Sequence, residues 1–205
     1  ALLFVSQDYT RLSTLSRLHR FALATLYAST NGEAWRDSSG WMSGDPVCNW
    51  YGISCRDGVV TGITMEFNKL IGTLPEEIGR LTSLEVLVFS ENELEGTIPS
   101  SFESLTNLKL LGLHENRLEG AALVFLVRMP WLVSISLTSN PISGTIPPQI
   151  GSMTSLTALH ISQNGMSGTI PETIRETRNL KVLELGSNAL SGTIPESLYD
   201  LNKLE

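Results

Sequence analysis

Apolar and polar residues recur along this chain with a period of 24 residues. Each period contains one asparagine, and the six members of the unbroken series are Asn68, Asn92, Asn116, Asn140, Asn164 and Asn188. Apolar residues stand eight, five and three positions before each asparagine and two positions after it, and a glycine stands four positions after it. A fixed period of this length indicates stacked units that bury their apolar faces against their neighbours.

Within each period the spacing predicts a short strand followed by a turn. Two apolar residues separated by one position, such as Leu87 and Phe89, point to the same side of a strand and so enter a common core. The asparagine at the end of the strand, such as Asn92, can hydrogen-bond to backbone groups that the turn leaves free. We therefore expect the asparagines to form a ladder along the stacked units.

The residues before the repeats, 11 to 57, do not follow the 24-residue period. Apolar residues recur there at helical spacing between Arg11, Arg17, His19 and Arg20, and they are Leu12, Leu15, Leu18, Ala22 and Leu26. This pattern predicts an amphipathic helix that buries its apolar face over the first repeat. The expected organisation is an N-terminal cap over 1–58 and six repeats plus the start of a seventh over 59–205. We expect the chain to be a fragment of a longer protein or to have a disordered tail, because it ends within a repeat.

Charge and composition exclude several classes of function. The chain carries 14 Lys and Arg against 21 Asp and Glu, which gives a net charge of −7 and argues against nucleic acid as a partner. No apolar run approaches the roughly 20 residues that span a bilayer, so direct membrane insertion is not expected. Two Cys and 3 His do not complete a zinc site, and motifs for phosphate binding or nucleophilic catalysis are absent. We expect no metal, no cofactor and no catalytic residues.

The repeat pattern resembles the plant-type class of leucine-rich repeat over residues 59 to 205. The segments Ser143-Gly144-Thr145-Ile146-Pro147 and Ser191-Gly192-Thr193-Ile194-Pro195 match the Ser-Gly-Thr-Ile-Pro portion of that repeat. The resemblance implies an α/β solenoid, a right-handed superhelix with a parallel concave sheet, short flanking strands and 3-10 or helical turns on the convex side.

A second resemblance lies in the cap. The segment Cys48-Asn49-Trp50-Tyr51-Gly52-Ile53-Ser54-Cys55 is similar to the Cys-x-Trp-x-Gly-Val-x-Cys cap signature of secreted plant-type repeat proteins. In that family the two cysteines form a disulfide, which implies an oxidising, extracellular compartment. The stretch from Leu26 to Trp35 is more similar to caps of secreted repeat proteins from algae, other protists and bacteria than to those of land-plant receptors.

The outward positions of the predicted concave sheet form columns that could bind a ligand. The first half is acidic through Glu66, Glu91 and Glu115, whereas the later repeats present mainly hydroxyl groups. His114 and His160 fall two strands apart, about 10 Å, which makes them poor ligands for one metal. The alternative is an ordinary solvated sheet face. The candidate residues are Glu66, Phe67, Val88, Glu91, His114, Glu115, Ser136, Thr138, His160, Ser162, Gln163 and Glu184.

The third repeat lacks the proline of its siblings and gains Ala and Leu, which predicts a regular helix on its convex side. The register directs Leu126 and Met129 inward. It also predicts an exposed apolar patch, and hence weak self-association or partner binding, at Val124, Phe125, Val127 and Trp131. The alternative is that a longer helix repacks and buries these four side chains.

The resemblance to ectodomains of plant receptor kinases and receptor-like proteins implies an extracellular, non-enzymatic recognition domain. Its partner would be a protein, a peptide or a carbohydrate. A secreted enzyme inhibitor or defence protein similar to polygalacturonase-inhibiting proteins is the main alternative. A structural or adhesion protein of a cell wall or matrix is a third, and an enzyme is the least favoured.

Overall fold

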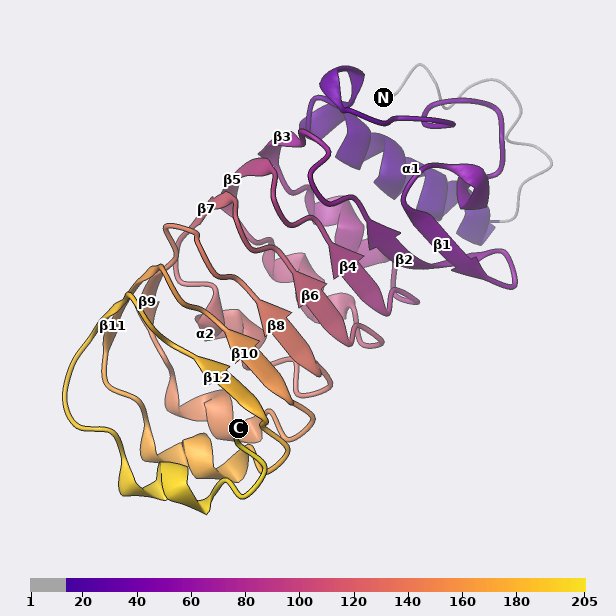
Figure 1. The fold of residues 1–205 in the computed structure, drawn as a ribbon. Helices are drawn as coiled ribbons and strands as arrows, with labels where there is room; N and C mark the ends of the chain where they lie inside the picture. Colours follow the sequence, from indigo (N-terminus) through magenta and orange to yellow (C-terminus); the bar gives the residue numbers. More distant parts are fainter. Residues whose placement is uncertain (1–13) are drawn as a thin grey trace.

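The computed structural model describes residues 14–205, which form a curved solenoid of stacked coils behind an N-terminal cap (Figure 1). The concave face is one seven-stranded sheet in the order β1-β2-β4-β6-β8-β10-β12. Every pair from β2 onward is parallel, and only β1 pairs antiparallel. The strands are β1 Ile53–Arg56, β2 Val59–Thr64, β4 Val86–Val88, β6 Leu110–Gly112, β8 Ser134–Ser136, β10 Ala158–His160 and β12 Val182–Glu184.

The register of the sheet confirms the 24-residue repeat. Leu87 pairs with Leu111, and Leu111 pairs with Ile135, so equivalent residues of successive coils stack directly on one another. These side chains are fully buried, as is Phe89 two positions farther along the coil. The core is therefore a continuous column of apolar side chains along the solenoid.

The asparagine ladder is confirmed as well. Asn116 Oδ1 accepts a hydrogen bond from the Leu94 amide at 3.0 Å, and its Nδ2 donates to the Phe89 and Leu113 carbonyls. Asn68, the first of the series, bonds instead to the cap, where it accepts from the amide of Asp37 and donates to its carbonyl. The ladder thus ties each coil to its predecessor and the first coil to the cap.

Two separate three-stranded sheets run along one flank. The first contains β3 Ile71–Thr73, β5 Glu93–Thr97 and β7 Arg117–Glu119, and the second contains β9 Ser143–Thr145, β11 Gly165–Gly168 and β13 Ala189–Leu190. A single bridge between Gly120 and Ile142 connects them. Pro141 accounts for the interruption, because it lacks the amide that Glu93 and Gly165 donate to the preceding coil at this position.

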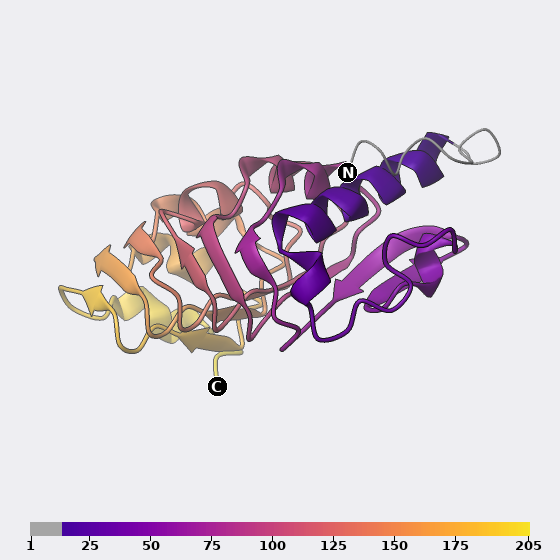
Figure 2. The same ribbon diagram turned by 90° about the horizontal axis from the view of Figure 1, so that it is seen from above.

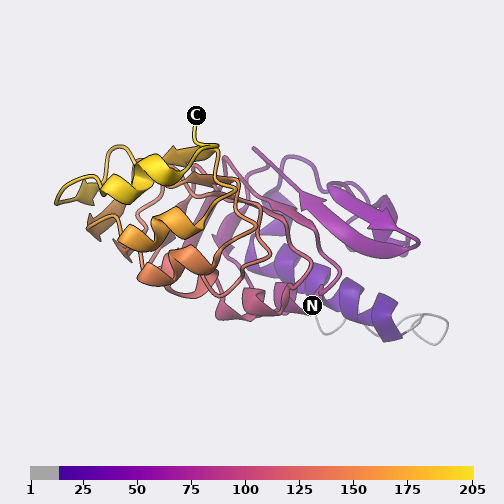
Figure 3. The same cartoon turned by 90° about the horizontal axis from the view of Figure 1, so that it is seen from below.

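Short 3-10 turns lie side by side on the convex face (Figure 3). They are η5 Glu76–Arg80, η6 Ser100–Ser104, η7 Pro148–Ser152, η8 Glu172–Glu176 and η9 Glu196–Asp200. The third coil has the α-helical turn α2, Leu123–Leu126, in their place, as its sequence predicts. Leu126 and Met129 are fully buried there, which confirms their predicted inward direction.

The cap places the helix α1, Thr14–Ser29, along the first coil, beside the β1–β2 hairpin (Figure 2). The 3-10 turns η3 Gly32–Ala34 and η4 Val47–Asn49 follow it. Cys48 and Cys55 form the disulfide that the resemblance implies. Tyr27, Trp35, Trp41 and Trp50 pack beside it as a cluster of aromatic rings with centroids 4.8 to 6.2 Å apart. This aromatic cluster covers the apolar end of the first coil.

The prediction of which side of α1 is buried is only partly correct. Leu15 and Leu18 are 43% and 37% exposed, whereas His19 and Arg20 are buried. The Arg20 guanidinium donates to the Ser43 and Asp45 carbonyls and lies 5.0 Å from the centre of the Trp50 ring, so the cap loop draws this polar side chain inward. Ala22 and Leu26 are buried as predicted, and Leu12 lies outside the described residues.

Candidate functional site

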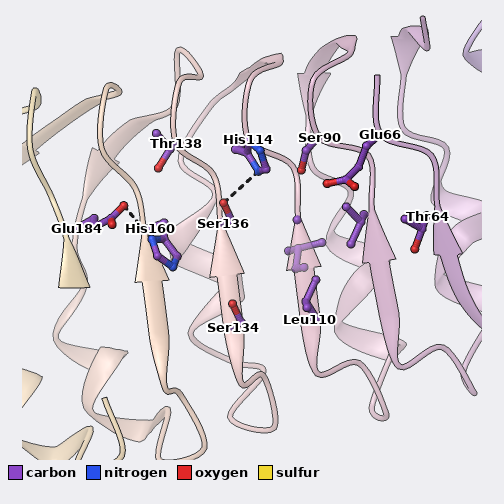
Figure 4. A pocket seen from close by; sticks show the side chains of 13 residues that line it. Thr64, Glu66, Ser90, Leu110, His114, Ser134, Ser136, Thr138, His160 and Glu184 are labelled. Carbon is purple, nitrogen blue, oxygen red and sulfur yellow. Dashed lines mark hydrogen bonds and ion pairs between the residues drawn. The ribbon is translucent and has the colours of Figure 1, made fainter. Parts of the chain in front are cut away.

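A shallow groove of about 470 Å³ runs across the concave sheet (Figure 4). Its middle is a strand row, one residue from each parallel strand: Thr64, Val88, Gly112, Ser136, His160 and Glu184. Above it is an edge row just past the strand ends, made of Glu66, Ser90, His114 and Thr138. Leu110 and Ser134 are among the residues that line the opposite side. The groove thus combines an apolar floor with polar groups at the 24-residue spacing.

The two histidines of the groove each contact the following coil. His160 Nδ1 lies 2.8 Å from Glu184 Oε2, and His114 Nδ1 lies 3.3 Å from Ser136 Oγ. The imidazoles are therefore held apart, as their register predicts. Within residues 14–205 no group of three or more His, Cys, Asp or Glu side chains is placed to hold a metal ion.

Two hydroxyl groups of the edge row are buried without a hydrogen-bond partner among the described residues, Ser90 Oγ and Thr138 Oγ1. Ser90 is 0% exposed. A Cβ placed on Gly112 would lie 3.4 Å from Ser90 Oγ and 3.2 Å from Val88 Cγ1, so a larger residue at position 112 would crowd both side chains. A buried polar group left unpaired costs about 1–3 kcal/mol, and His19 Nε2 and Trp50 Nε1 of the cap are in the same state.

A third column lies at the rim of the groove. Phe67, Glu91, Glu115 and Gln163 all have a left-handed backbone, with φ between 51° and 55°. The sequence places them on the sheet, but the strands have already ended because the chain turns there toward the asparagine ladder. The guanidinium of Arg36 covers the Phe67 ring at 3.4 Å from its centre. Gln163 accepts a hydrogen bond from a serine of the preceding coil at 2.7 Å.

Seven of the twelve predicted binding residues line the groove, and five do not. Those that line it are Glu66, Val88, His114, Ser136, Thr138, His160 and Glu184. Those outside its lining are Phe67, Glu91, Glu115, Ser162 and Gln163. Ser90, Gly112 and Leu110 were missed as candidates. Gly112 could have been found as the glycine that interrupts a column of larger side chains.

Carboxylates concentrate at one end of the site. Glu91 and Glu115 neighbour the edge row, since their amides donate to the carbonyls of His114 and Thr138, both at 2.9 Å. In the part of the chain that the structure describes, no ion pair or hydrogen bond engages the carboxylates of Glu66, Glu91 and Glu115. This end of the groove therefore carries uncompensated negative charge.

The exposed apolar patch expected on the third coil is largely absent. Val124 is 50% exposed, but Val127 is buried, and Phe125 and Trp131 are half-buried against the core. Trp131 Nε1 also donates to the Leu105 carbonyl at 2.9 Å. The prediction is wrong for Val127 because an α-helical turn has a wider inward face than a 3-10 turn.

No described helix is long and apolar enough to cross a membrane.

Comparison with family models gives matches to three parts of the chain. A model described as leucine rich repeat matches residues 154–205, and a second model of the same description matches 83–105 and 131–153. Receptor-like protein 5 of Arabidopsis thaliana is 38% identical over 50 residues, which are 24% of this chain and 18% of that protein.

Solved structures match over nearly the whole chain. Pollen Receptor Kinase 3 is 32% identical, with a TM-score of 0.78, and the match covers 93% of this chain and 90% of that one. The Arabidopsis receptor kinase HAESA, solved with the peptide hormone IDA and the co-receptor SERK1, is 28% identical with a TM-score of 0.79. That match covers 94% of this chain but 33% of the HAESA chain in that structure. This chain thus spans a third of that HAESA chain and less than a fifth of Receptor-like protein 5.

Proposed function

Since this chain belongs to the leucine-rich repeat proteins, we propose that it is an extracellular, non-enzymatic recognition domain whose concave sheet binds a protein, a peptide or a carbohydrate. The observation that carries the proposal is the groove across the concave sheet, whose lining includes His114, Ser136 and His160, beside carboxylates that form no ion pair among residues 14–205. Residues 1–58 would serve as the cap and 59–205 as the recognising repeats.

Two observations support an extracellular location. The Cys48–Cys55 disulfide persists only where the environment is oxidising. The similar structures include receptor ectodomains, among them HAESA with its peptide hormone. Receptor-like protein 5 and HAESA are plant proteins, and the similarity of the cap to algal, protist and bacterial repeat proteins stays a prediction.

The contacts in the groove favour binding over catalysis. His114 meets Ser136, but no carboxylate contacts the His114 ring among residues 14–205, so the third member of a nucleophilic triad is missing there. His160 has a carboxylate partner in Glu184, but no hydroxyl contact with its ring is found in the same residues. A ligand held by such groups would be recognised rather than transformed.

Retention of molecules from extracellular fluid tests the concave site. The chain would be immobilised as wild type, as a concave variant (His114→Ala, Glu115→Ala, His160→Ala) and as a matched convex variant (Gln149→Ala, Glu172→Ala, Arg178→Ala) whose targets are all exposed. We expect mass spectrometry to find a ligand retained by the wild type and the convex variant and lost from the concave one. Equal retention by the concave variant would contradict the proposal.

A secreted enzyme inhibitor is the second candidate, and the unpaired Glu66, Glu91 and Glu115 favour it because they suit a basic protein surface. Its distinguishing measurement is the activity of cell-wall-degrading enzymes incubated with the chain. A decrease that depends on these three carboxylates would support inhibition, and full activity at saturating chain concentration would exclude it.

A further inference from the structure

We infer that Asn31 is a modification site, at which the chain converts its own asparagine to aspartate and isoaspartate through a cyclic imide. The sequence contains two Asn-Gly steps, Asn31-Gly32 in the cap and Asn164-Gly165 in the repeats. Asparagine is chemically labile, and a glycine that follows it has no side chain to hinder ring closure. The structure leaves the cap step free to react and protects the repeat step. The modification would proceed whether or not the concave sheet binds a ligand.

The reaction needs only the chain and water. The backbone nitrogen of Gly32 loses its proton and attacks Cγ of Asn31, the new N–C bond closes the imide ring, and Nδ2 leaves as ammonia with that proton. Water then adds to one of the imide carbonyls and breaks its bond to nitrogen. Opening at the side-chain carbonyl leaves aspartate, whereas opening at the main-chain carbonyl leaves isoaspartate, in which the main chain runs through Cβ. The sum is a loss of ammonia and a gain of water, with no oxidation or reduction.

Both reacting groups of the cap step are free of hydrogen bonds. Asn31 is exposed, and its side chain forms no cap hydrogen bond and no other one among residues 14–205. The amide of Gly32 donates to no described backbone or side-chain oxygen. The Asn31 carbonyl accepts from the Ala34 amide at 2.9 Å, and this bond must break when the main chain rotates to bring the nitrogen to Cγ. A short surface turn of this kind opens at low free-energy cost.

The repeat step is protected at both reacting groups. Asn164 Oδ1 accepts from the Ile142 amide at 3.2 Å, and Nδ2 donates to three carbonyls, among them that of Ser162 at 2.9 Å. The Gly165 amide donates to the Ile142 carbonyl at 2.7 Å, which holds the attacking nitrogen against the preceding coil. Reaction there requires two coils to separate, which costs more free energy than the opening of a turn.

The fold requires both residues that make the cap step reactive. Asn31 has a left-handed backbone, with φ 55° and ψ 52°, which asparagine and glycine adopt more readily than other residues. A Cβ on Gly32 would lie 2.2 to 2.4 Å from atoms of the Tyr27 ring, so a larger residue would displace this ring. Tyr27 belongs to the aromatic cluster that covers the first coil. The packing of the cap therefore places a reactive pair at its own surface.

The two products should affect the cap differently. Aspartate tolerates the left-handed backbone as asparagine does, whereas isoaspartate adds a main-chain atom to the turn. This turn connects the cap to the flank, because the Thr30 carbonyl accepts from Trp35 Nε1 at 2.8 Å and from the Ile71 amide of β3 at 3.1 Å. A longer main chain would shift Thr30 relative to Trp35. Isoaspartate should therefore loosen the contact between the cap and β3.

Ageing of the disulfide-bonded whole chain in mildly alkaline buffer, below its melting temperature, tests the inference. Peptide mapping by mass spectrometry should show conversion at Asn31, and an isoaspartyl methyltransferase should label the isoaspartate formed there. Conversion at Asn164 should be slower by about tenfold or more, because the ladder must lose hydrogen bonds that the turn does not have.

The matched control is the same chain, reduced and denatured, in which both Asn-Gly steps should convert at similar rates. This control separates the effect of the fold from the effect of the sequence. If Asn31 of the folded chain stays intact while the denatured control converts, the inference is overturned. Equal rates at Asn31 and Asn164 in the folded chain would overturn it as well.

Two variants separate the reaction from its effect on the cap. Asn31→Gly keeps a residue that adopts the left-handed backbone and removes the reacting amide, so it should not age. Asn31→Asp carries the charge of the products on a normal main chain. Hydrogen exchange at the Ile71 amide should become about five- to tenfold faster in the isoaspartate fraction of the aged wild type, the effect of losing one hydrogen bond, and should stay unchanged in freshly made samples of both variants. Equally fast exchange in fresh Asn31→Asp, or none in the isoaspartate fraction, would overturn the loosening of the cap.

Discussion

The first three coils, 60–131, and the last three, 132–203, have one backbone register and different surfaces. The first half carries 10 acidic and 5 basic residues, a net charge of −5, and the second carries 5 and 4, a net charge of −1. Both halves stack equivalent apolar residues in the same parallel sheet. The comparison shows that burial determines only the inward positions, so the outward ones can differ without altering the fold.

The third coil is the junction between these halves. It alone replaces the 3-10 turn with α2, and the flanking sheet is interrupted immediately after it. Within its own bounds the α-helical turn buries Leu123 and Leu126, whereas the 3-10 turn η6 buries Phe102. The change of surface therefore coincides with a change of packing on the opposite face.

Removal of a ladder asparagine should have the largest effect and should test how equivalent the halves are. Asn116→Ala leaves the Leu94 amide unpaired in the interior and removes one of the two side-chain bonds that the Phe89 and Leu113 carbonyls each accept, at an expected cost of about 3–5 kcal/mol in unfolding free energy. Asn188→Ala should cost only about 1–2 kcal/mol, because Asn188 is half-buried and water can enter where its side chain is removed. Denaturant unfolding measures both, and equal costs would contradict the difference in burial.

Removal of the disulfide should affect the two halves unequally. Cys48→Ser with Cys55→Ser releases a loop closed over a separation of 7 residues, worth about 2–3 kcal/mol on the chain-entropy model. Since each coil contacts mainly its neighbours, hydrogen exchange should speed up in the cap and the first coils and stay unchanged in the last. The wild type in reductant should reproduce the pattern. Uniform acceleration along the solenoid would show instead that the coils unfold as one unit.

The repeats were predictable from the sequence because every inward position is decided by a local, periodic requirement for burial. The buried face of α1 was not predictable in this way. Arg20 is buried because it donates to the carbonyls of Ser43 and Asp45, which are more than 20 positions away in sequence. The same holds for the site. The columns followed from the register, but whether Ser90 Oγ has a partner depends on the exact reach of neighbouring side chains.

Acidification should weaken the cap more than the repeats. Burial lowers the pKa of His19 below its ordinary value of 6.5. Between the lowered pKa and 6.5 the unfolded chain binds more protons than the folded one, so stability is complete above pH 6.5 and is lost as pH falls through this window. The slope is at most about 1.4 kcal/mol per pH unit for one proton. His19→Leu should reduce the slope in thermal melts, and an unchanged slope would assign it to other groups.

The smallest expected effects concern α2. They test whether the third coil serves only internal packing or also forms an interaction surface. Trp131→Phe removes the bond to the Leu105 carbonyl and should cost about 1 kcal/mol, whereas Val124→Ser, on an exposed side chain, should change stability by less than about 0.5 kcal/mol. Neither should alter the mass in sedimentation equilibrium, because the buried Val127 and the half-buried Phe125 leave too little apolar area for self-association. A wild-type dimer that Val124→Ser dissociates would restore the interface and make the third coil a binding surface in its own right.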